Sequence, residues 1–100
     1  MSFKGKVIVI TGAGSGIGAA AVRFFAKKEA RVVLADISLE KMVGISESIP
    51  MECMIQETDV SQYEQMQGLV VAVIKKYGRI DVWVNNAGIG PDHMLKTADH

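Results

Sequence analysis

The feature that most constrains the fold is a change of hydrophobic period that repeats along the chain. Continuous runs of β-branched and aliphatic residues alternate with segments whose apolar residues recur every three or four positions. A continuous apolar run is typical of a strand buried on both faces, and the longer spacing is typical of a helix packed along one face. Strands that alternate with helices predict a parallel sheet with right-handed connections and helices on both faces.

The pattern predicts four strands, over residues 7–10, 31–36, 51–58 and 80–84. The third is the weakest, because apolar and polar residues alternate in it and do not form a continuous run. With a helix after each of the first three strands, the order is β-α-β-α-β-α-β. We therefore expect an α/β fold with a doubly wound parallel sheet that is truncated after its fourth strand.

The three expected helices have recognisable ends. The first covers residues 17–28, Ser38 caps a second that runs to about residue 48, and Ser61 caps a third that Gly78 ends. The apolar stripes that should face the sheet are Ile17, Ala20, Ala21, Phe24 and Phe25 in the first helix, and Met66, Leu69, Val70, Val73 and Ile74 in the third.

The amino-acid composition excludes several classes of binding partner. Eleven basic and eleven acidic residues give a net charge of zero, unlike proteins that bind nucleic acid or membrane surfaces. Cys53 is the one cysteine and cannot form an internal disulfide, and the chain shows neither a signal peptide nor a membrane span. His93 and His100 have no Cys or carboxylate at metal-ligand spacing. We expect a cytoplasmic protein with no metal site, nucleic-acid partner or membrane partner.

A glycine-rich loop, Thr11-Gly12-Ala13-Gly14-Ser15-Gly16-Ile17-Gly18, joins the first strand to the first helix. Glycines at such a junction let the backbone turn tightly and approach a phosphate, while the helix N-terminus offers unpaired N–H groups and a positive dipole. The loop lacks the lysine of a P-loop, and Ile17 stands where a strict G-x-G-x-x-G would have its third glycine. Glycines that serve only a tight turn are the alternative interpretation.

This loop resembles the cofactor loop of the short-chain dehydrogenase/reductase family. Asp59-Val60 and Asn85-Asn86-Ala87-Gly88 match the next two landmarks of that family in order and approximate spacing, and the resemblance extends from Gly5 to Pro91. It implies a Rossmann-type fold and an NAD(P)-dependent oxidoreductase that moves a hydride between nicotinamide and a small-molecule alcohol or ketone. It also implies a homo-oligomer.

Asp36 ends the second expected strand, eighteen positions beyond Gly18. A carboxylate there can accept hydrogen bonds from both ribose hydroxyls of an adenosine and would repel a 2′-phosphate. Neither the glycine loop nor Ile37 and Ser38 supply a basic residue that could hold such a phosphate. The sequence therefore predicts NAD as the cofactor in preference to NADP, with capping of the following helix as the alternative role of Asp36.

The resemblance also assigns the later landmarks. It implies that Asp59 accepts from the adenine amino group and that Val60 contacts adenine through its backbone, although Asp59 could equally be a turn residue before Ser61. It gives Asn85 a structural part and places the three residues after it along the nucleotide. The predicted cofactor-binding residues are Gly12, Ser15, Gly16, Ile17, Gly18, Asp36, Ile37, Asp59, Val60, Asn86, Ala87 and Gly88.

The catalytic Ser, Tyr and Lys of the family have no counterpart in this sequence. Gln67 and Asp81 follow four residues after Tyr63 and Tyr77, so neither tyrosine begins a Tyr-x-x-x-Lys motif. We therefore expect residues 1–100 to be the N-terminal dinucleotide-binding part of one Rossmann domain, incomplete at its C-terminus and inactive alone. A non-catalytic adenine-nucleotide module and an interaction fragment remain as alternatives.

Two features predict marginal stability and self-association. The fourth strand should have an open edge, which exposes Ile80, Val82 and Val84 to pairing with another copy. Glu29 stands where relatives usually carry glycine at the end of the first helix, and a left-handed backbone at a non-glycine residue costs about 1 kcal/mol.

Overall fold

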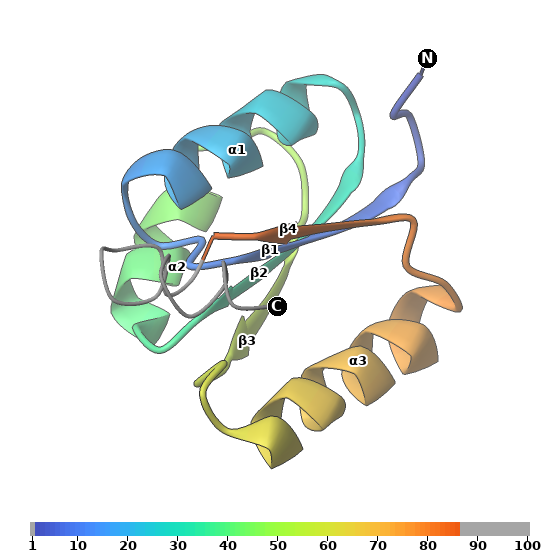
Figure 1. Ribbon diagram of the computed structural model, residues 1–100. Helices are drawn as coiled ribbons and strands as arrows, with labels where there is room; N and C mark the ends of the chain where they lie inside the picture. The colour runs from blue at the N-terminus through green and yellow to red at the C-terminus, as the bar shows by residue number, and fades with distance from the viewer. Residues whose placement is uncertain (1, 87–100) are drawn as a thin grey trace, which may run out of the picture.

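The computed structural model describes residues 2–86 of the chain. Four strands form one parallel sheet in the spatial order β3-β2-β1-β4 (Figure 1). They are β1 (Val7–Thr11), β2 (Arg31–Asp36), β3 (Met54–Glu57) and β4 (Val82–Asn85). The chain moves outward from β1 to β3 and then returns to add β4 on the other side of β1. This confirms the doubly wound α/β fold.

Helices cover both faces of the sheet, as its parallel pairing requires (Figure 1). The helices α1 (Gly16–Lys27) and α2 (Leu39–Glu47) share one core cluster with the sheet, and α3 (Tyr63–Tyr77) packs in a second cluster. Within the described part of the chain, no helix is long and apolar enough to cross a membrane.

The inner strands β1 and β2 carry the core, because alternate residues of each strand point to opposite faces. All five residues of β1 are buried, as its β-branched run predicts. On one face the buried side chains are Ile8, Ile10, Val32 and Leu34 with Val22 and Met42 of the helices. On the other face they are Val7, Val9, Val33 and Ala35 with Leu69 and Val73 of α3.

The outer strands are shorter than the sequence indicates. β3 pairs with β2 over four residues, from Val33 opposite Met54 to Asp36 opposite Glu57. β4 pairs with β1 from Val82 onward and continues one residue beyond the predicted end, to Asn85. Each outer strand has one neighbour in the described part of the sheet and pairs with it over four residues.

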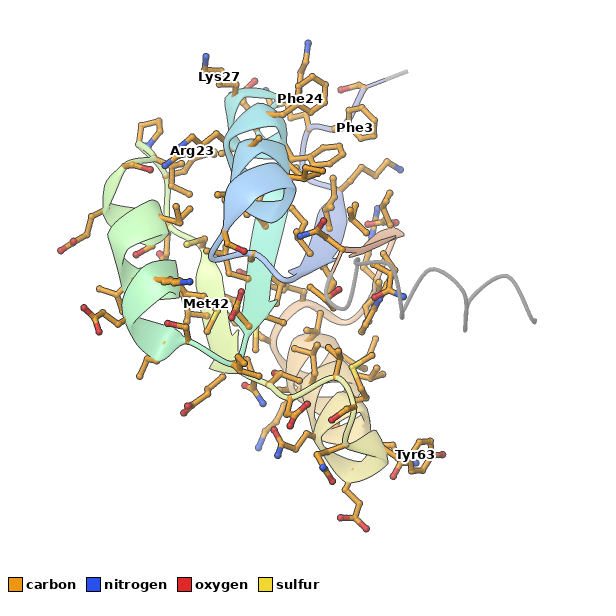
Figure 2. The ribbon with its side chains drawn as sticks, turned by 60° about the vertical axis from the view of Figure 1, so that its left-hand side comes forward. Phe3, Arg23, Phe24, Lys27, Met42 and Tyr63 are labelled. Atoms are coloured by element: carbon orange, nitrogen blue, oxygen red, sulfur yellow. The ribbon has the colours of Figure 1, made fainter. Side chains whose placement is uncertain are left out.

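The predicted stripe of α1 faces the core only in part, because Ala21 and Phe25 pack against it half-buried while other members of the stripe are exposed. Ile17 is 71% exposed and Phe24 is 51% exposed, and Figure 2 shows Phe24 and Lys27 at the outer end of the helix. Small side chains let the helix approach the sheet closely, so they occupy the centre of the contact, and Ile17 and Phe24 lie outside it. The residues that the structure buries are Gly18, Ala19, Val22 and Ala26.

In α3 the predicted stripe is buried only in part. Leu69 and Val73 are fully buried, but Val70 is 39% and Ile74 44% exposed. The apolar arc of this helix is therefore wider than its contact with the sheet.

One of the two predicted serine caps is present. The hydroxyl of Ser38 accepts the amide N–H of Lys41 at 3.3 Å and caps α2 as expected. The prediction for Ser61 is wrong, because Gln62 is the N-cap of α3 and makes no side-chain cap hydrogen bond. The Ser61 hydroxyl instead donates to Asp59 Oδ1 at 2.6 Å. The helix α3 therefore begins one residue later than a cap at Ser61 would place it, and Ser61 belongs to the turn before the helix.

Two helix ends use a left-handed residue. Gly78 ends α3 with φ +80°, as predicted, and Glu29 follows α1 with φ +63°. Among the described residues, Glu29 is the one non-glycine residue with a positive φ.

Replacing Glu29 with glycine is therefore expected to raise the free energy of unfolding by about 1 kcal/mol, because glycine adopts this conformation without steric cost. Urea denaturation followed by circular dichroism measures the change. The Gly78→Ala variant should shift stability in the opposite direction by a similar amount. A Glu29→Gly variant no more stable than the parent chain would contradict the prediction.

Asp81 connects the start of β4 to β1. Its Oδ2 atom accepts Arg79 Nε at 2.8 Å and the amide N–H of Val7 at 2.7 Å. The hydrogen bond from Arg79, followed by that from Val7, lowers the pKa of Asp81 below the usual value for a carboxyl group. Because its pKa is lower in the folded state, the ionised carboxyl of Asp81 stabilises the fold at neutral pH. This stabilisation is lost as the pH falls through that lowered value.

We expect Asp81→Asn to lower the melting temperature at pH 7. The difference from the parent chain should begin to shrink below about pH 4, the usual value for an Asp carboxyl, and should vanish once the pH falls below the lowered pKa of Asp81 in the folded state. Thermal melts of both chains between pH 7 and pH 2.5 test this. A difference that stays constant over the whole range would show that the charge of Asp81 contributes nothing.

Candidate functional site

The candidate site lies where β1, β2 and β4 end and the glycine loop begins. The strand order reverses here, because β2 and β4 flank β1 on opposite sides. Open parallel sheets bind ligands at such a switch point, outside the carboxyl ends of their strands. The loop, Asp36 at the end of β2 and Asn85 at the end of β4 all lie at this edge.

The glycine loop turns sharply into α1. Gly12 and Gly16 have φ values of +64° and +48°, which L side chains rarely adopt. Ser15 is the N-cap of α1, but its side chain makes no cap hydrogen bond in the described structure. The amide N–H groups of Gly16 and Ile17 have no carbonyl partner inside the helix, because they belong to its first turn. Together with the positive end of the helix dipole, they can bind an anion such as a phosphate.

Gly18 is the tightest point of the site. A Cβ atom added there would overlap the carbonyl oxygen of Gly12 and would lie 2.7 Å from Nδ2 of Asn86. Real Cβ atoms do not approach other atoms so closely, and one of the two neighbours is backbone. Glycine at position 18 therefore lets α1 begin directly against the loop and against the end of β4.

Hydrogen bonds from Thr11 and Asn86 tie the loop to β4. The hydroxyl of Thr11 accepts the amide N–H of Asn86 at 3.0 Å and donates to Asn85 Oδ1, also at 3.0 Å. Nδ2 of Asn86 donates to the carbonyl oxygen of Gly12 at 3.1 Å. Residues more than seventy positions apart in the sequence thus hold one end of the site together. The sequence places Asn86 along the nucleotide, whereas in the structure its amide group binds the loop itself.

Asp36 is held from two sides. Its Oδ2 atom accepts the amide N–H of Gly14 at 2.9 Å, and Oδ1 accepts that of Ser38 at 2.9 Å. The capping role that the sequence offered as an alternative for Asp36 belongs to Ser38, which is the N-cap of α2. The bond from Ser38 orients the carboxylate locally, and the bond from Gly14 links it directly to the glycine loop. A carboxylate oxygen has two lone pairs, so each oxygen can accept a further donor. The carboxylate is therefore oriented by backbone groups and can still receive hydroxyl groups.

Asp59 and Val60 follow β3, farther along the same edge. Asp59 is half-buried, and its Oδ1 atom accepts the hydroxyl and the amide N–H of Ser61 at 2.6 and 3.0 Å. These hydrogen bonds lower the pKa of the Asp59 carboxyl. The contacts fit the turn role that the sequence offered as an alternative. Val60 is partly buried beside it, and Ile37 after β2 is 67% exposed. Ala87 and Gly88 lie outside the described residues.

Sequence reasoning missed Gly14 and Lys41. A Cβ on Gly14 would lie 2.8 Å from the Cβ of Lys41, so the loop passes close to the first turn of α2. The repeated glycines of the loop were the available signal for Gly14, and nothing in the sequence pattern pointed to Lys41. Within residues 2–86, no group of three or more His, Cys, Asp or Glu side chains could hold a metal ion.

Comparisons with known proteins agree with this geometry. A family model described as short chain dehydrogenase matches residues 6–100. The chain is 44% identical over 98 residues to the 3-oxoacyl-acyl-carrier-protein reductase FabG of Thermotoga maritima, covering 95% of this chain and 40% of that protein. It is 44% identical over 90 residues to the meso-2,3-butanediol dehydrogenase of Serratia marcescens, covering 89% of this chain and 36% of that protein.

Solved structures are similar over the same part. A short chain dehydrogenase/reductase from Burkholderia phymatum in complex with NAD superposes with a TM-score of 0.85 at 36% identity, covering 90% of this chain and 33% of that one. A 3-ketoacyl-(acyl-carrier-protein) reductase from Brucella melitensis complexed with NADH gives 0.83 at 38% identity, covering 89% and 36%. The chain spans about 40% of the length of the first of the curated relatives.

Proposed function

The chain belongs to the short-chain dehydrogenase family, and from that premise we propose that it binds NAD as part of an oxidoreductase acting on an alcohol or a ketone. The observation that carries the proposal is the carboxylate of Asp36, which accepts the amide N–H of Gly14 in the glycine loop. Similar structures with bound NAD and NADH support it.

The residues of the site fit the parts of this dinucleotide. The first amide groups of α1, at Gly16 and Ile17, would hold the pyrophosphate, and Asp36 would accept the hydroxyls of the adenosine ribose. Bound nicotinamide would supply the hydride donor or acceptor. The remaining predicted contacts are Gly12, Ser15, Gly18, Ile37, Asp59, Val60, Asn86, Ala87 and Gly88.

The preference for NAD over NADP follows from the anchoring of Asp36. A 2′-phosphate would stand next to this carboxylate, and two anions at such short distance repel each other. The backbone bonds to Gly14 and Ser38 hold the carboxylate in place, so turning it away would break both. An uncharged ribose can instead donate hydrogen bonds to it.

In this proposal, residues 1–100 form the dinucleotide-binding part of a single Rossmann domain and catalyse no hydride transfer by themselves. They contain no Tyr-x-x-x-Lys motif that could supply the acid/base group. A single cysteine, which cannot form an internal disulfide, supports a cytoplasmic location. Chemistry on an alcohol or ketone then requires groups beyond those that this sequence contains.

Calorimetric titration of the chain with NAD and with NADP tests the proposal. We expect binding of NAD with clearly weaker binding of NADP. Absence of NAD binding by a chain that circular dichroism shows to be folded would overturn it.

One observation favours a second role, as an interaction fragment. β4 is an outer strand of the described sheet, and Val82, Trp83 and Val84 on it are only partly buried. Unpaired strand edges of this kind associate with a second copy. Light scattering at high protein concentration should then report species larger than one chain, and a clean monomer would contradict this role.

A further inference from the structure

One lysine has its backbone and Cβ next to the proposed ribose site. Lys41 lies in the first turn of α2, and its Cβ is 2.8 Å from the point that a Cβ on Gly14 would occupy. Oδ2 of Asp36 lies 3.1 Å from the same point. The stem of Lys41 and the carboxylate of Asp36 therefore contact the same residue of the glycine loop.

Hydrogen bonds fix the backbone of Lys41 relative to Asp36. The amide N–H of Lys41 donates to Oγ of Ser38 at 3.3 Å, and the amide N–H of Ser38 donates to Oδ1 of Asp36 at 2.9 Å. The side chain itself is exposed, and it forms no ion pair within residues 2–86. A lysine stem has four flexible carbons, so its ammonium group can reach the space in front of the carboxylate.

We propose that Lys41 determines how far the adenosine subsite tolerates a 2′-phosphate. The inference rests on the proposed function, because it assumes that Asp36 accepts the adenosine ribose. A 2′-phosphate in this subsite meets two opposite charges, the carboxylate of Asp36 and the ammonium group of Lys41. The hydroxyl of an NAD ribose carries no charge, so Lys41 has little effect on it. Asp36 therefore makes the subsite prefer NAD, and Lys41 determines how strong that preference over NADP is.

The test compares Lys41→Gln with the parent chain, using NAD and NADP as probes in titrations followed by NMR, which also reads weak binding. We expect the dissociation constant for NADP to rise about three- to five-fold, the upper part of the range for one exposed charge pair. That for NAD should change less than about two-fold. Lys41→Arg should retain the parent ratio, because it keeps the charge.

Lys27→Gln is the matched control, because Lys27 ends α1 at the opposite end from the glycine loop (Figure 2). It removes the same charge and should change neither constant. Unchanged NADP binding by Lys41→Gln would overturn the inference, and so would an equal loss for both nucleotides. Failure of the parent chain to bind NAD would contradict the proposed function itself, and the two failures are therefore distinguishable.

Discussion

Replacing Gly18 with alanine is expected to destabilise the fold by about 3 kcal/mol or more, the upper range for overpacking of a tight interior. The new Cβ would overlap the carbonyl oxygen of Gly12 and would lie 2.7 Å from Nδ2 of Asn86. Relief requires α1 to move away from β4, which breaks the hydrogen bond between Asn86 and Gly12. Urea denaturation of the two chains measures the loss.

The same substitution elsewhere provides the control. Gly68 lies within α3, and no atom stands within 4 Å of the place that its Cβ would take. Gly68→Ala should therefore raise the free energy of unfolding by about 0.5–1 kcal/mol, because alanine is the better helix former. Denaturation of Gly18→Ala at the same urea concentration as the parent would refute the close contact.

Replacing Asp36 with alanine is expected to weaken NAD binding by at least about 100-fold. Each charge-assisted hydrogen bond to a ribose hydroxyl contributes about 1.5–3 kcal/mol, and two would be lost. The amide N–H groups of Gly14 and Ser38 also lose their acceptors, which loosens the loop on the pyrophosphate side. Calorimetric titration with NAD gives the dissociation constants of both chains.

Glu57 is the matched control for this substitution. It stands opposite Asp36 in the register of β2 and β3, and its exposed carboxylate is at the same edge of the sheet. Glu57→Ala removes one negative charge there without touching the loop, so its affinity for NAD should match that of the parent. If Asp36→Ala binds NAD as tightly as Glu57→Ala, Asp36 does not bind the ribose.

The strands and their arrangement could be predicted because the pattern that encodes them is local. β2 has the predicted limits, and the runs in β1 and β2 are buried on both faces as expected. A sheet of alternating strands and helices then has few possible topologies.

The packing face of α1 could not be predicted in the same way. Ile17 and Phe24 form an apolar stripe, but the face with Gly18 and Val22 is the one in contact with the sheet. The hydrophobic period predicts that the larger side chains of α1 pack on the sheet. The face that actually packs is decided by how closely the helix can approach the sheet. The distance between α1 and the sheet depends on the carbonyl of Gly12 and on Asn86, which lie next to Gly18. Neither residue belongs to α1, so the hydrophobic pattern of the helix carries no information about them.

The candidate site was predictable in location and less so in detail. Strand ends and glycines locate it, because the carboxyl ends of parallel strands meet at one edge. The partners of Asp36, Ser61 and Asn86 depend on competition between nearby donors and acceptors. Ser61 illustrates this, since its hydroxyl donates to Asp59 and the helix begins one residue later, with Gln62 as its N-cap.

The bonds between Thr11 and the end of β4 bear on the order in which the molecule assembles. Thr11 and Asn85 are 74 positions apart, whereas β1 meets β2 across a separation of 24, as in the pair of Val7 and Arg31. Contacts of large sequence separation form late, because closing the longer loop costs more entropy. During synthesis β1, β2 and β3 can therefore associate before β4 docks. The proposed nucleotide site is completed only by that last step, so a nucleotide bound there would favour the finished sheet and oppose its opening.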